Sequence, residues 1–420
     1  MLLKRAIVLS GGGSRGAYQI GVWKALRKLN INYDIVTGTS IGALNGALMT
    51  QKDYYGAIKL WNFINYNKIL DTKIDGSYDS HRGRREIILK FTKGALEGGL
   101  KVGAMEATID KYLNVNKFFA SDIDYGLVTV KFPSMKPTIM KKKDLTKELL
   151  KDYLIASAAC FPAFKIKNIN SESYIDGGYY DNMPINLAIE MGATEVIAVD
   201  LNSIGKEKKV SNHNVPVTII RPRNDIGNFL IIEKKYARRA IELGYNDTLK
   251  AFEKLDGYFF TFKKNQLINN YNKYAKDFFD NLFNIINKKK LKSDLIIKII
   301  NKTSYKKILS GKNDVSEFNK VVEESGKIFG LDDEVIYSFN FYNHLIKKRF
   351  QKLNIQSVDD IKSMIKSKKI KSLFNRRNMV YYIYKEIEKS KGSKLSIYNL
   401  AILFPTEFLS AVYIKTLLSR

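Results

Sequence analysis

The first part of the chain repeats a simple pattern of hydrophobic and polar positions. Short apolar runs rich in β-branched residues alternate with longer stretches in which apolar residues recur at helical spacing. Lys4–Ser10 and Glu195–Leu201 are typical of buried strands, and Ala17–Leu29 is typical of a helix. Strands that alternate with helices predict an α/β layer with a mostly parallel central sheet.

The same criteria place further elements along this layer. Strands are predicted at Tyr33–Thr37, Gly126–Phe132, Thr138–Lys141, Val215–Arg221 and Gly257–Phe262, the last of which is expected to close the sheet. Helices are predicted at Ile41–Met49, Tyr54–Ile64, Met105–Leu113, Lys147–Ala159, Pro184–Met191 and Phe229–Leu255. Residues 65–103 are polar and contain the basic cluster His81–Arg85. We expect an insertion or lid there, whose basic cluster is either a solvated face or a contact for phosphate head groups.

From Lys264 onward the pattern changes. Strand-like runs largely vanish, and lysine, asparagine and isoleucine dominate. The segment Leu395–Leu418 is unusually apolar, which predicts either a helix pair in a domain core or a helix in a membrane interface. We therefore divide the chain into an α/β domain, residues 1–263, and a basic, mainly helical domain of unknown role, residues 264–420. Helical spacing in the second domain is clearest at Ile296–Ile308 and Ile361–Phe374.

Charge is the compositional feature that bears on function. The 420 residues include 70 Lys and Arg against 42 Asp and Glu, a net charge of +28. About +16 of it falls on residues 264–420. Such a field attracts anionic partners, either acidic lipid or nucleic acid. An AT-rich genome would also produce the bias toward Lys, Asn, Ile and Tyr, without any partner.

Cysteine usage and the length of apolar runs bound the environment. Cys160 is the only cysteine, so an intrachain disulfide is impossible and a Cys-ligated metal site is not expected. The apolar run Ala6–Leu9 is too short for a signal peptide. The sequence contains no run of about 18 apolar residues, so no transmembrane helix is predicted. We therefore expect a cytoplasmic protein that uses no metal or cofactor and contacts an anionic membrane surface peripherally.

The stretch Gly38-Thr39-Ser40-Ile41-Gly42 fits the G-x-S-x-G pattern of a nucleophile elbow. A predicted strand precedes it and a predicted helix follows it, which is the context that this turn requires. A serine at such a turn has its hydroxyl lifted out of the sheet, where a substrate can reach it. An ordinary glycine-rich turn is the alternative.

A second glycine-rich turn, Gly11–Gly16 (GGGSRG), joins the first predicted strand to a helix. Its backbone N–H groups are expected to point toward negative charge, as in an oxyanion hole. The turn also satisfies G-x-G-x-x-G, the dinucleotide-binding pattern. That alternative needs an acidic residue at the end of the second strand, whereas Asp34 lies at its start. The sequence thus favours the oxyanion hole.

Asp176-Gly177-Gly178 ends a short run that is typical of a strand. An aspartate followed by two glycines presents its carboxylate on an open turn. It either serves its own turn or supplies the base that a nucleophilic serine needs.

These three blocks, in this order, resemble the patatin-like phospholipases, and in particular the bacterial type. The small-residue helix end Ser157–Phe164 also resembles the stretch that precedes the family's aspartate. The resemblance covers about residues 1–263 and implies a three-layer domain that acts as a lipid acyl hydrolase. The residues that carry it are Gly11, Gly12, Gly13, Arg15 and Gly16 (oxyanion element), Gly38, Ser40 and Gly42 (elbow), and Asp176, Gly177 and Gly178.

By this resemblance, Ser40 is the nucleophile and Asp176 the general base, with no histidine between them. The glycine-rich turn would hold the oxyanion, and Arg15 would either fix that turn or meet a phosphate. A Ser-His-Asp triad is the alternative mechanism. Of the three histidines, only His213 follows Ser40 and Asp176 in the order of an α/β-hydrolase.

The leading prediction is therefore a serine esterase that cleaves phospholipids or other acyl lipids. The alternative is a basic membrane- or nucleic-acid-binding protein whose hydrolase domain is gated by the C-terminal region. The sequence contains no zinc-ligand spacing or nucleic-acid motif, so only charge supports nucleic acid. A site built from glycine and serine specifies acyl transfer but not the lipid.

Overall fold

The structure, a computed structural model, describes residues 3–71, 79–288, 315–353, 375–389 and 394–420. Its contacts divide the chain into two compact units, Met1–Phe252 and Glu253–Arg420. The division falls before the predicted boundary at residues 263 and 264, because the short strands after Phe252 pair within the second unit.

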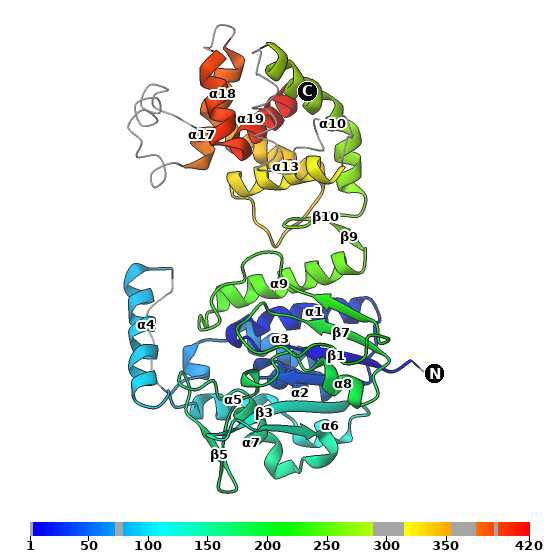
Figure 1. The fold of residues 1–420 in the computed structure, drawn as a ribbon, viewed down its shortest axis with the longest axis vertical. Helices are drawn as coiled ribbons and strands as arrows, with labels where there is room; N and C mark the ends of the chain where they lie inside the picture. The colour runs from blue at the N-terminus through cyan, green and yellow to red at the C-terminus, as the bar shows by residue number, and fades with distance from the viewer. Residues whose placement is uncertain (1–2, 72–78, 289–314, 354–374, 390–393) are drawn as a thin grey trace. The chain divides into compact units, whose positions relative to one another are not determined.

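The first unit is built on one mixed sheet in the order β5-β6-β3-β2-β1-β7-β8, with β4 paired to β3 (Figure 1). Neighbours from β3 to β8 are parallel, whereas β4, β5 and β6 join antiparallel. The mostly parallel α/β sheet is thus confirmed. The strands are β1 (Arg5–Leu9), β2 (Ile35–Thr39), β3 (Asp124–Phe132), β4 (Pro137–Lys141), β5 (Lys167–Ile169), β6 (Glu172–Asp176), β7 (Glu195–Val199) and β8 (Val217–Ile220).

Helices cover both faces of this sheet. Ile7 and Leu9 of β1 enter the core shared with α1, α2, α3 and α9, while Ala6 and Val8 face α8, where Ala188 packs. This alternation is the period of two expected of a strand that is buried on both sides. The helices are α1 (Ala17–Lys28), α2 (Ile41–Thr50), α3 (Tyr54–Asn62), α4 (His81–Leu96), α5 (Gly103–Tyr112), α6 (Val115–Ala120), α7 (Lys147–Ser157), α8 (Ile185–Glu190) and α9 (Lys234–Ala251).

Strand register sets the position of the candidate site. Leu9, the last residue of β1, lies opposite Gly38 of β2 on one side and Val199 of β7 on the other. The carboxyl ends of these parallel strands therefore meet at one edge, where open α/β sheets bind their ligands. Both glycine-rich turns begin at this edge.

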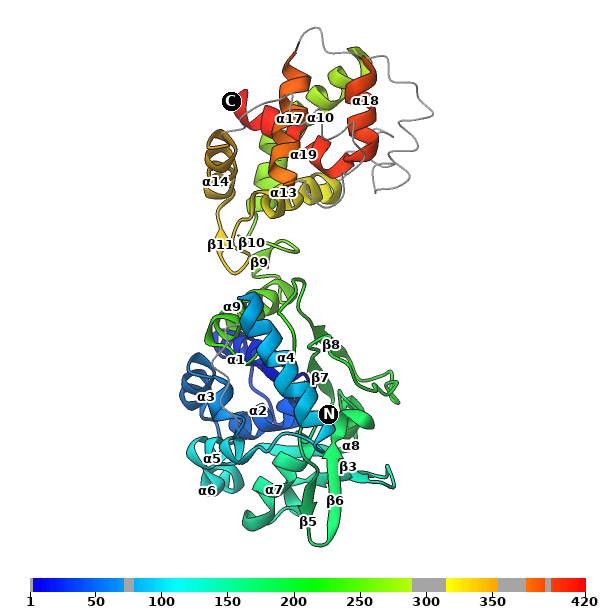
Figure 2. The same cartoon turned by 90° about the vertical axis from the view of Figure 1, so that its left-hand side faces the viewer.

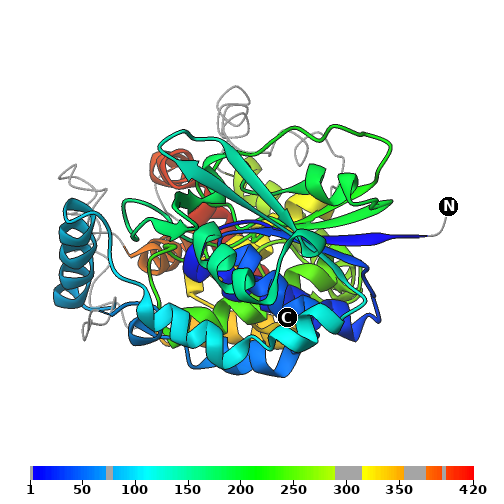
Figure 3. The same ribbon diagram turned by 90° about the horizontal axis from the view of Figure 1, so that it is seen from below.

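The predicted insertion contains α4, which lies at the margin of the first unit in Figures 1 and 3 and in front of that unit in Figure 2. Ser80 caps the helix by accepting a hydrogen bond from the Gly83 N–H at 2.9 Å. The basic cluster His81–Arg85 thus forms the first turn of a regular helix.

The second unit is mainly helical, as expected. Its small sheet pairs β10 (Thr261–Lys263) with β9 (Leu255–Asp256) and β11 (Ile336–Tyr337). The prediction that Gly257–Phe262 closes the central sheet was wrong, because its hydrogen bonds go to these two strands. Aromatic and β-branched residues indicate a strand but do not specify its partner. The helices are α10 (Gln266–Lys288), α13 (Val315–Phe329), α14 (Phe339–Gln351), α17 (Arg376–Glu388), α18 (Lys394–Leu403) and α19 (Pro405–Leu418).

The apolar segment near the end of the chain forms α18 and α19, and both contribute to the core of the second unit. Residues 408–414 of α19 are all buried. Of the two alternatives for this segment, the structure has the packed helix pair. The predicted helices Ile296–Ile308 and Ile361–Phe374 lie outside the described residues.

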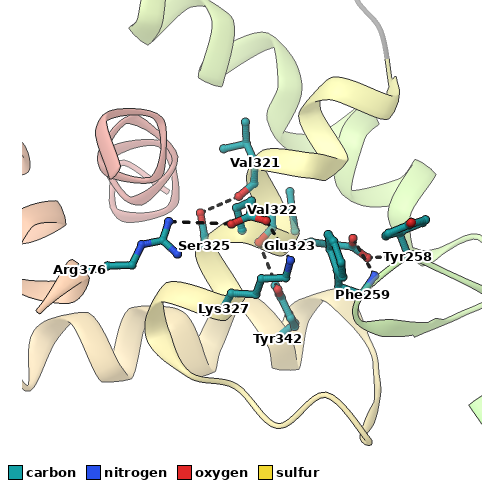
Figure 4. Close-up of polar contacts among 10 residues, drawn as sticks. Tyr258, Phe259, Val321, Val322, Glu323, Ser325, Lys327, Tyr342 and Arg376 are labelled. Atoms are coloured by element: carbon teal, nitrogen blue, oxygen red, sulfur yellow. Dashed lines mark hydrogen bonds and ion pairs between the residues drawn. The ribbon is translucent and has the colours of Figure 1, made fainter. Parts of the chain in front are cut away.

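A buried carboxylate fixes the turn between β9 and β10 (Figure 4). Glu323 of α13 accepts hydrogen bonds from the backbone N–H groups of Tyr258 and Phe259, at 2.8 and 3.1 Å. Lys327, one helical turn further on, lies against the face of the Phe259 ring. Helix α13 thus supplies the hydrogen-bond acceptor for two N–H groups of the turn that β9 and β10 do not pair.

Candidate active site

Ser40 lies at a sharp turn between β2 and α2. Its backbone has φ 57° and ψ −126°, a conformation that residues other than glycine rarely adopt. The two flanking glycines make the turn possible, because a Cβ on Gly42 would lie 2.2 Å from the Leu9 carbonyl oxygen. A Cβ on Gly38 would lie 2.4 Å from the Gly42 carbonyl group. The geometry is that of a nucleophile elbow.

A buried serine on α7 supports this turn. The Ser157 hydroxyl accepts a hydrogen bond from the Ser40 N–H at 3.0 Å and donates one to the Val128 carbonyl at 2.7 Å. Ser157 is fully buried, so both bonds are shielded from water. The Ser40 N–H is therefore used in holding the turn and is not available to an oxyanion.

Asp176 lies at the end of β6, and its carboxylate faces the same cavity as Ser40. Its Oδ1 atom accepts a hydrogen bond from the Gly178 N–H at 2.7 Å. Burial raises the pKa of Asp176 to about 6, while an interaction with the Ser40 hydroxyl and the Gly178 hydrogen bond lower it. A carboxylate with such a pKa is a better base than an exposed one and is still ionised at neutral pH.

A second buried aspartate helps to single out Asp176. Burial also raises the pKa of Asp181 to about 6. Its carboxylate accepts a hydrogen bond from the Met183 N–H, and it is not among the residues that line the cavity. Of these two aspartates, only Asp176 shares the cavity with Ser40.

The glycine-rich turn enters the cavity beside Ser40. The Gly11 N–H donates to the Asn182 carbonyl at 3.0 Å, and the Ser14 N–H donates to the Phe229 carbonyl at 2.9 Å. Within the described part of the chain, the N–H groups of Gly12 and Gly13 have no protein acceptor. These two donors lie in the cavity wall, as an oxyanion hole requires.

Arg15 holds this turn in place. Its guanidinium donates to the carbonyls of Gly227 and Asn202, each at 2.7 Å, and to that of Leu201 at 3.3 Å. These bonds tie the turn to the segments that carry Leu201, Asn202 and Gly227. Gly16 is needed for packing, since a Cβ there would lie 2.4 Å from the Ile41 side chain.

Both candidate catalytic groups open into a cavity of about 570 Å³. Helices α2, α3 and α5 supply about a third of the residues that line it. The lining is largely apolar, with Leu44, Leu48, Trp61, Ile64, Met105, Ile109 and Phe164 among its residues. A largely apolar wall beside a polar end is suited to an acyl chain whose ester group lies at Ser40.

Sequence reasoning missed residues that support the site from distant parts of the chain. Asn182 lines the cavity, and its amide Nδ2 donates to the Ser203 hydroxyl at 3.3 Å. Ser203 in turn hydrogen-bonds the Gly11 carbonyl. Cys160 also lines the cavity, and burial raises the pKa of its thiol to about 12, so it stays protonated. Single polar residues such as these carry no spacing signal in one sequence.

The histidines do not join the site. His213 is exposed in the loop before β8 and does not line the cavity. His81 is exposed on α4, and His344 belongs to the second unit. The site therefore offers a serine and a carboxylate without the histidine that a triad needs.

Sheet order and site together define an α/β protein whose candidate site lies at the carboxyl ends of its parallel strands. Residues 7–189 match the family model "Patatin-like phospholipase". This part of the chain is therefore similar to the patatin-like phospholipases, which confirms the resemblance seen in the sequence.

Relatives with assigned names agree with this. Patatin-like phospholipase domain-containing protein 7 of Rattus norvegicus is 28% identical over 209 residues, which cover 47% of this chain and 14% of the relative. Lysophospholipase nte1 of Aspergillus terreus is 27% identical over 213 residues, 47% of this chain and 12% of the relative. The chain thus matches only a small part of each.

Among solved structures, VipD from Legionella pneumophila aligns at 14% identity with a TM-score of 0.37, covering 99% of this chain and 90% of that one. The type III effector ExoU aligns at 13% identity with a TM-score of 0.34, covering 97% of this chain and 87% of that one.

In the described parts of this chain, every helix is too short or too polar to cross a bilayer.

Proposed function

We propose that the protein is a serine lipid acyl hydrolase that works through a Ser40–Asp176 dyad. One observation carries the proposal: Ser40, Asp176 and the N–H groups of Gly12 and Gly13, which have no acceptor among the described residues, open into one apolar cavity. The names of the relatives, which include phospholipases and a lysophospholipase, support a lipid ester as the substrate.

In the first half of the reaction, Asp176 takes the hydroxyl proton of Ser40 as the oxygen attacks the ester carbonyl. The carbonyl oxygen becomes an anion that accepts hydrogen bonds from Gly12 and Gly13. One oxyanion donor is typically worth about 3 kcal/mol of transition-state stabilisation. When the intermediate collapses, the alcohol leaves with the proton from Asp176, and the fatty acyl group stays on Ser40.

In the second half, water donates a proton to Asp176 and attacks the carbonyl carbon of the acyl-enzyme. The oxyanion that forms again accepts hydrogen bonds from Gly12 and Gly13. Collapse then releases the fatty acid and returns the proton to Ser40. The aspartate must be ionised at the start of each half. The rate is therefore expected to rise with pH until the pH exceeds about 6.

The cavity supports the proposed substrate class. Its volume and apolar lining suit a fatty-acyl chain of a phospholipid or lysophospholipid. Such lipids reside in bilayers, and the net charge of +28 favours peripheral contact with an anionic surface.

A fluorophosphonate probe tests the proposal, because it forms a covalent bond with an activated serine. The wild-type protein should be labelled, and Ser40→Ala should not. Trp23 and Trp61, the two tryptophans of the chain, are buried in the first unit, so their fluorescence checks that the variant is folded. Labelling that persists in Ser40→Ala would exclude Ser40 as the nucleophile. A lipid panel with the untreated wild-type protein and Ser40→Ala then identifies the ester.

A further inference from the structure

Helix α4 presents one exposed face with the spacing of a continuous helical stripe. The face combines aliphatic and basic side chains, and Ile88, Leu89 and Leu96 are 61%, 57% and 85% exposed. Isolated exposed aliphatic residues are common, but three on one face of one helix form a patch. The exposed residues of the helix are His81, Arg82, Arg85, Ile88, Leu89, Thr92, Lys93 and Leu96.

The opposite face fixes α4 to the wall of the cavity. Phe91 is buried and packs edge-on against Phe164, with 6.3 Å between ring centroids. Phe164 itself lines the cavity that holds Ser40. Gly94 allows a close approach, since a Cβ there would lie 2.4 Å from a methyl carbon of Leu100. The exposed face is therefore the outside of an element that touches the candidate active site.

Charge on the exposed face is almost entirely positive. Arg82 and Arg85 form no ion pair with any described residue. Lys93 is 3.8 Å from Glu97, an exposed pair that contributes little. A second copy of the chain is a poor occupant for this face, because pairing two such faces would bring their basic residues together.

We propose that the exposed face of α4 is a docking surface for an anionic lipid bilayer. Basic side chains meet acidic head groups, while Ile88, Leu89 and Leu96 enter the boundary between head groups and acyl chains. A bilayer surface satisfies both the basic and the aliphatic side chains along the length of the helix. Docking would bring the cavity to its lipid, and this consequence rests on the proposed function.

Vesicle binding tests the surface separately from catalysis. The full chain carrying Ser40→Ala is sedimented with vesicles of phosphatidylcholine alone or with 30% phosphatidylserine as a chosen composition, roughly as anionic as a cytoplasmic leaflet. Binding should require the anionic lipid. On this background, Arg82→Glu with Arg85→Glu should weaken binding by about 25-fold or more, taking about fivefold for each basic residue. Ile88→Ser with Leu89→Ser should weaken it by about tenfold or more.

Matched controls lie on the hairpin of β3 and β4 and beside it. Lys136→Glu with Lys143→Glu makes the same change in net charge on exposed residues. Met135→Ser with Ile139→Ser removes two aliphatic side chains that are 45% and 39% exposed. Both control pairs should bind vesicles within about twofold of the Ser40→Ala protein, since long-range charge is screened beyond about 10 Å.

A soluble short-chain ester separates the two proposals. With Ser40 restored, both α4 pairs should hydrolyse this ester at the wild-type rate and lose activity on anionic vesicles in proportion to binding. If the wild type did not hydrolyse the ester, the proposed function would be refuted. The docking surface would then be judged by vesicle binding alone. Unchanged vesicle binding by both α4 pairs, or equal losses in the control pairs, would overturn the docking surface. Binding of the α4 face to a protein and not to vesicles would overturn it as well.

Discussion

Replacing Asp176 by asparagine is expected to abolish activity and to stabilise the first unit. Burial raises the pKa of Asp176 from 3.8 to about 6, so the folded protein holds a buried charge at neutral pH that the unfolded chain solvates. At about 1.4 kcal/mol per pH unit, this gap corresponds to about 3 kcal/mol of unfolding free energy. Asparagine keeps an oxygen for the Gly178 N–H and carries no charge.

The sign of this effect makes it dependent on pH. Between pH 3.8 and about 6, the folded protein keeps a proton that the unfolded chain has lost. The stability that this carboxyl contributes is therefore complete below pH 3.8 and is lost as the pH rises through about 6. The advantage of Asp176→Asn should accordingly be about 3 kcal/mol at pH 8 and about 1 kcal/mol at pH 4.5.

Urea unfolding followed by tryptophan fluorescence measures this, because Trp23 and Trp61 both report on the first unit. Asp181 is present in both proteins, so its own titration cancels. Asp200→Asn is a matched control: Asp200 is buried but lies 3.3 Å from Arg221, so its loss should bring no gain. Equal stability of Asp176→Asn and wild type at pH 8, or a gain that is independent of pH, would refute this reasoning.

Three further predictions concern the site. For a soluble ester, kcat/KM should fall about tenfold for each pH unit below about pH 6, and every variant that keeps Asp176 should show this fall. A kcat/KM that is constant from pH 5 to 8 would argue against Asp176 as the base. Ser157→Ala removes two buried hydrogen bonds of the elbow and should cost about 1–3 kcal/mol in urea unfolding, with a lower kcat and little change in KM; Ser157→Thr, which keeps the hydroxyl, should recover part of kcat, and an unaffected kcat in Ser157→Ala would rule out its positioning role. His213→Ala should keep full esterase activity, because that side chain is exposed outside the cavity, whereas an inactive but folded variant would favour a triad.

The sequence was sufficient to predict the α/β layer because the strands of its sheet are strongly biased. Buried runs such as those of β1 and β7 have few other solutions, and the glycines around Ser40 permit a turn that other residues do not. The strand predicted at Gly257–Phe262 was assigned to the wrong sheet. The strand that forms, Thr261–Lys263, pairs with Leu255–Asp256 and with Ile336–Tyr337, and the second of these lies far along the chain. Pairing over such a distance leaves no local pattern.

The site shows the same division. Local motifs mark Ser40, Asp176 and the Gly11–Gly16 turn one by one. A local motif does not say which segments meet in space, so only the family resemblance placed these three together. The supports of the elbow, such as Ser157 and Asn182, are single residues whose roles depend on tertiary contacts. The aliphatic face of α4 was also missed, because Ile88, Leu89 and Leu96 become a patch only when the helix buries its other side.

The central claim is that Ser40 and Asp176 act as one catalytic unit. The most direct test compares kcat/KM for a fatty-acyl ester in Ser40→Ala, Asp176→Asn and the double variant, each shown to be folded by tryptophan fluorescence. Each single change should lower kcat/KM by about 10³-fold or more, and the double variant should be no worse than the weaker single one. An Asp176→Asn protein that is nearly as active as the wild type, or losses that multiply in the double variant, would contradict the dyad.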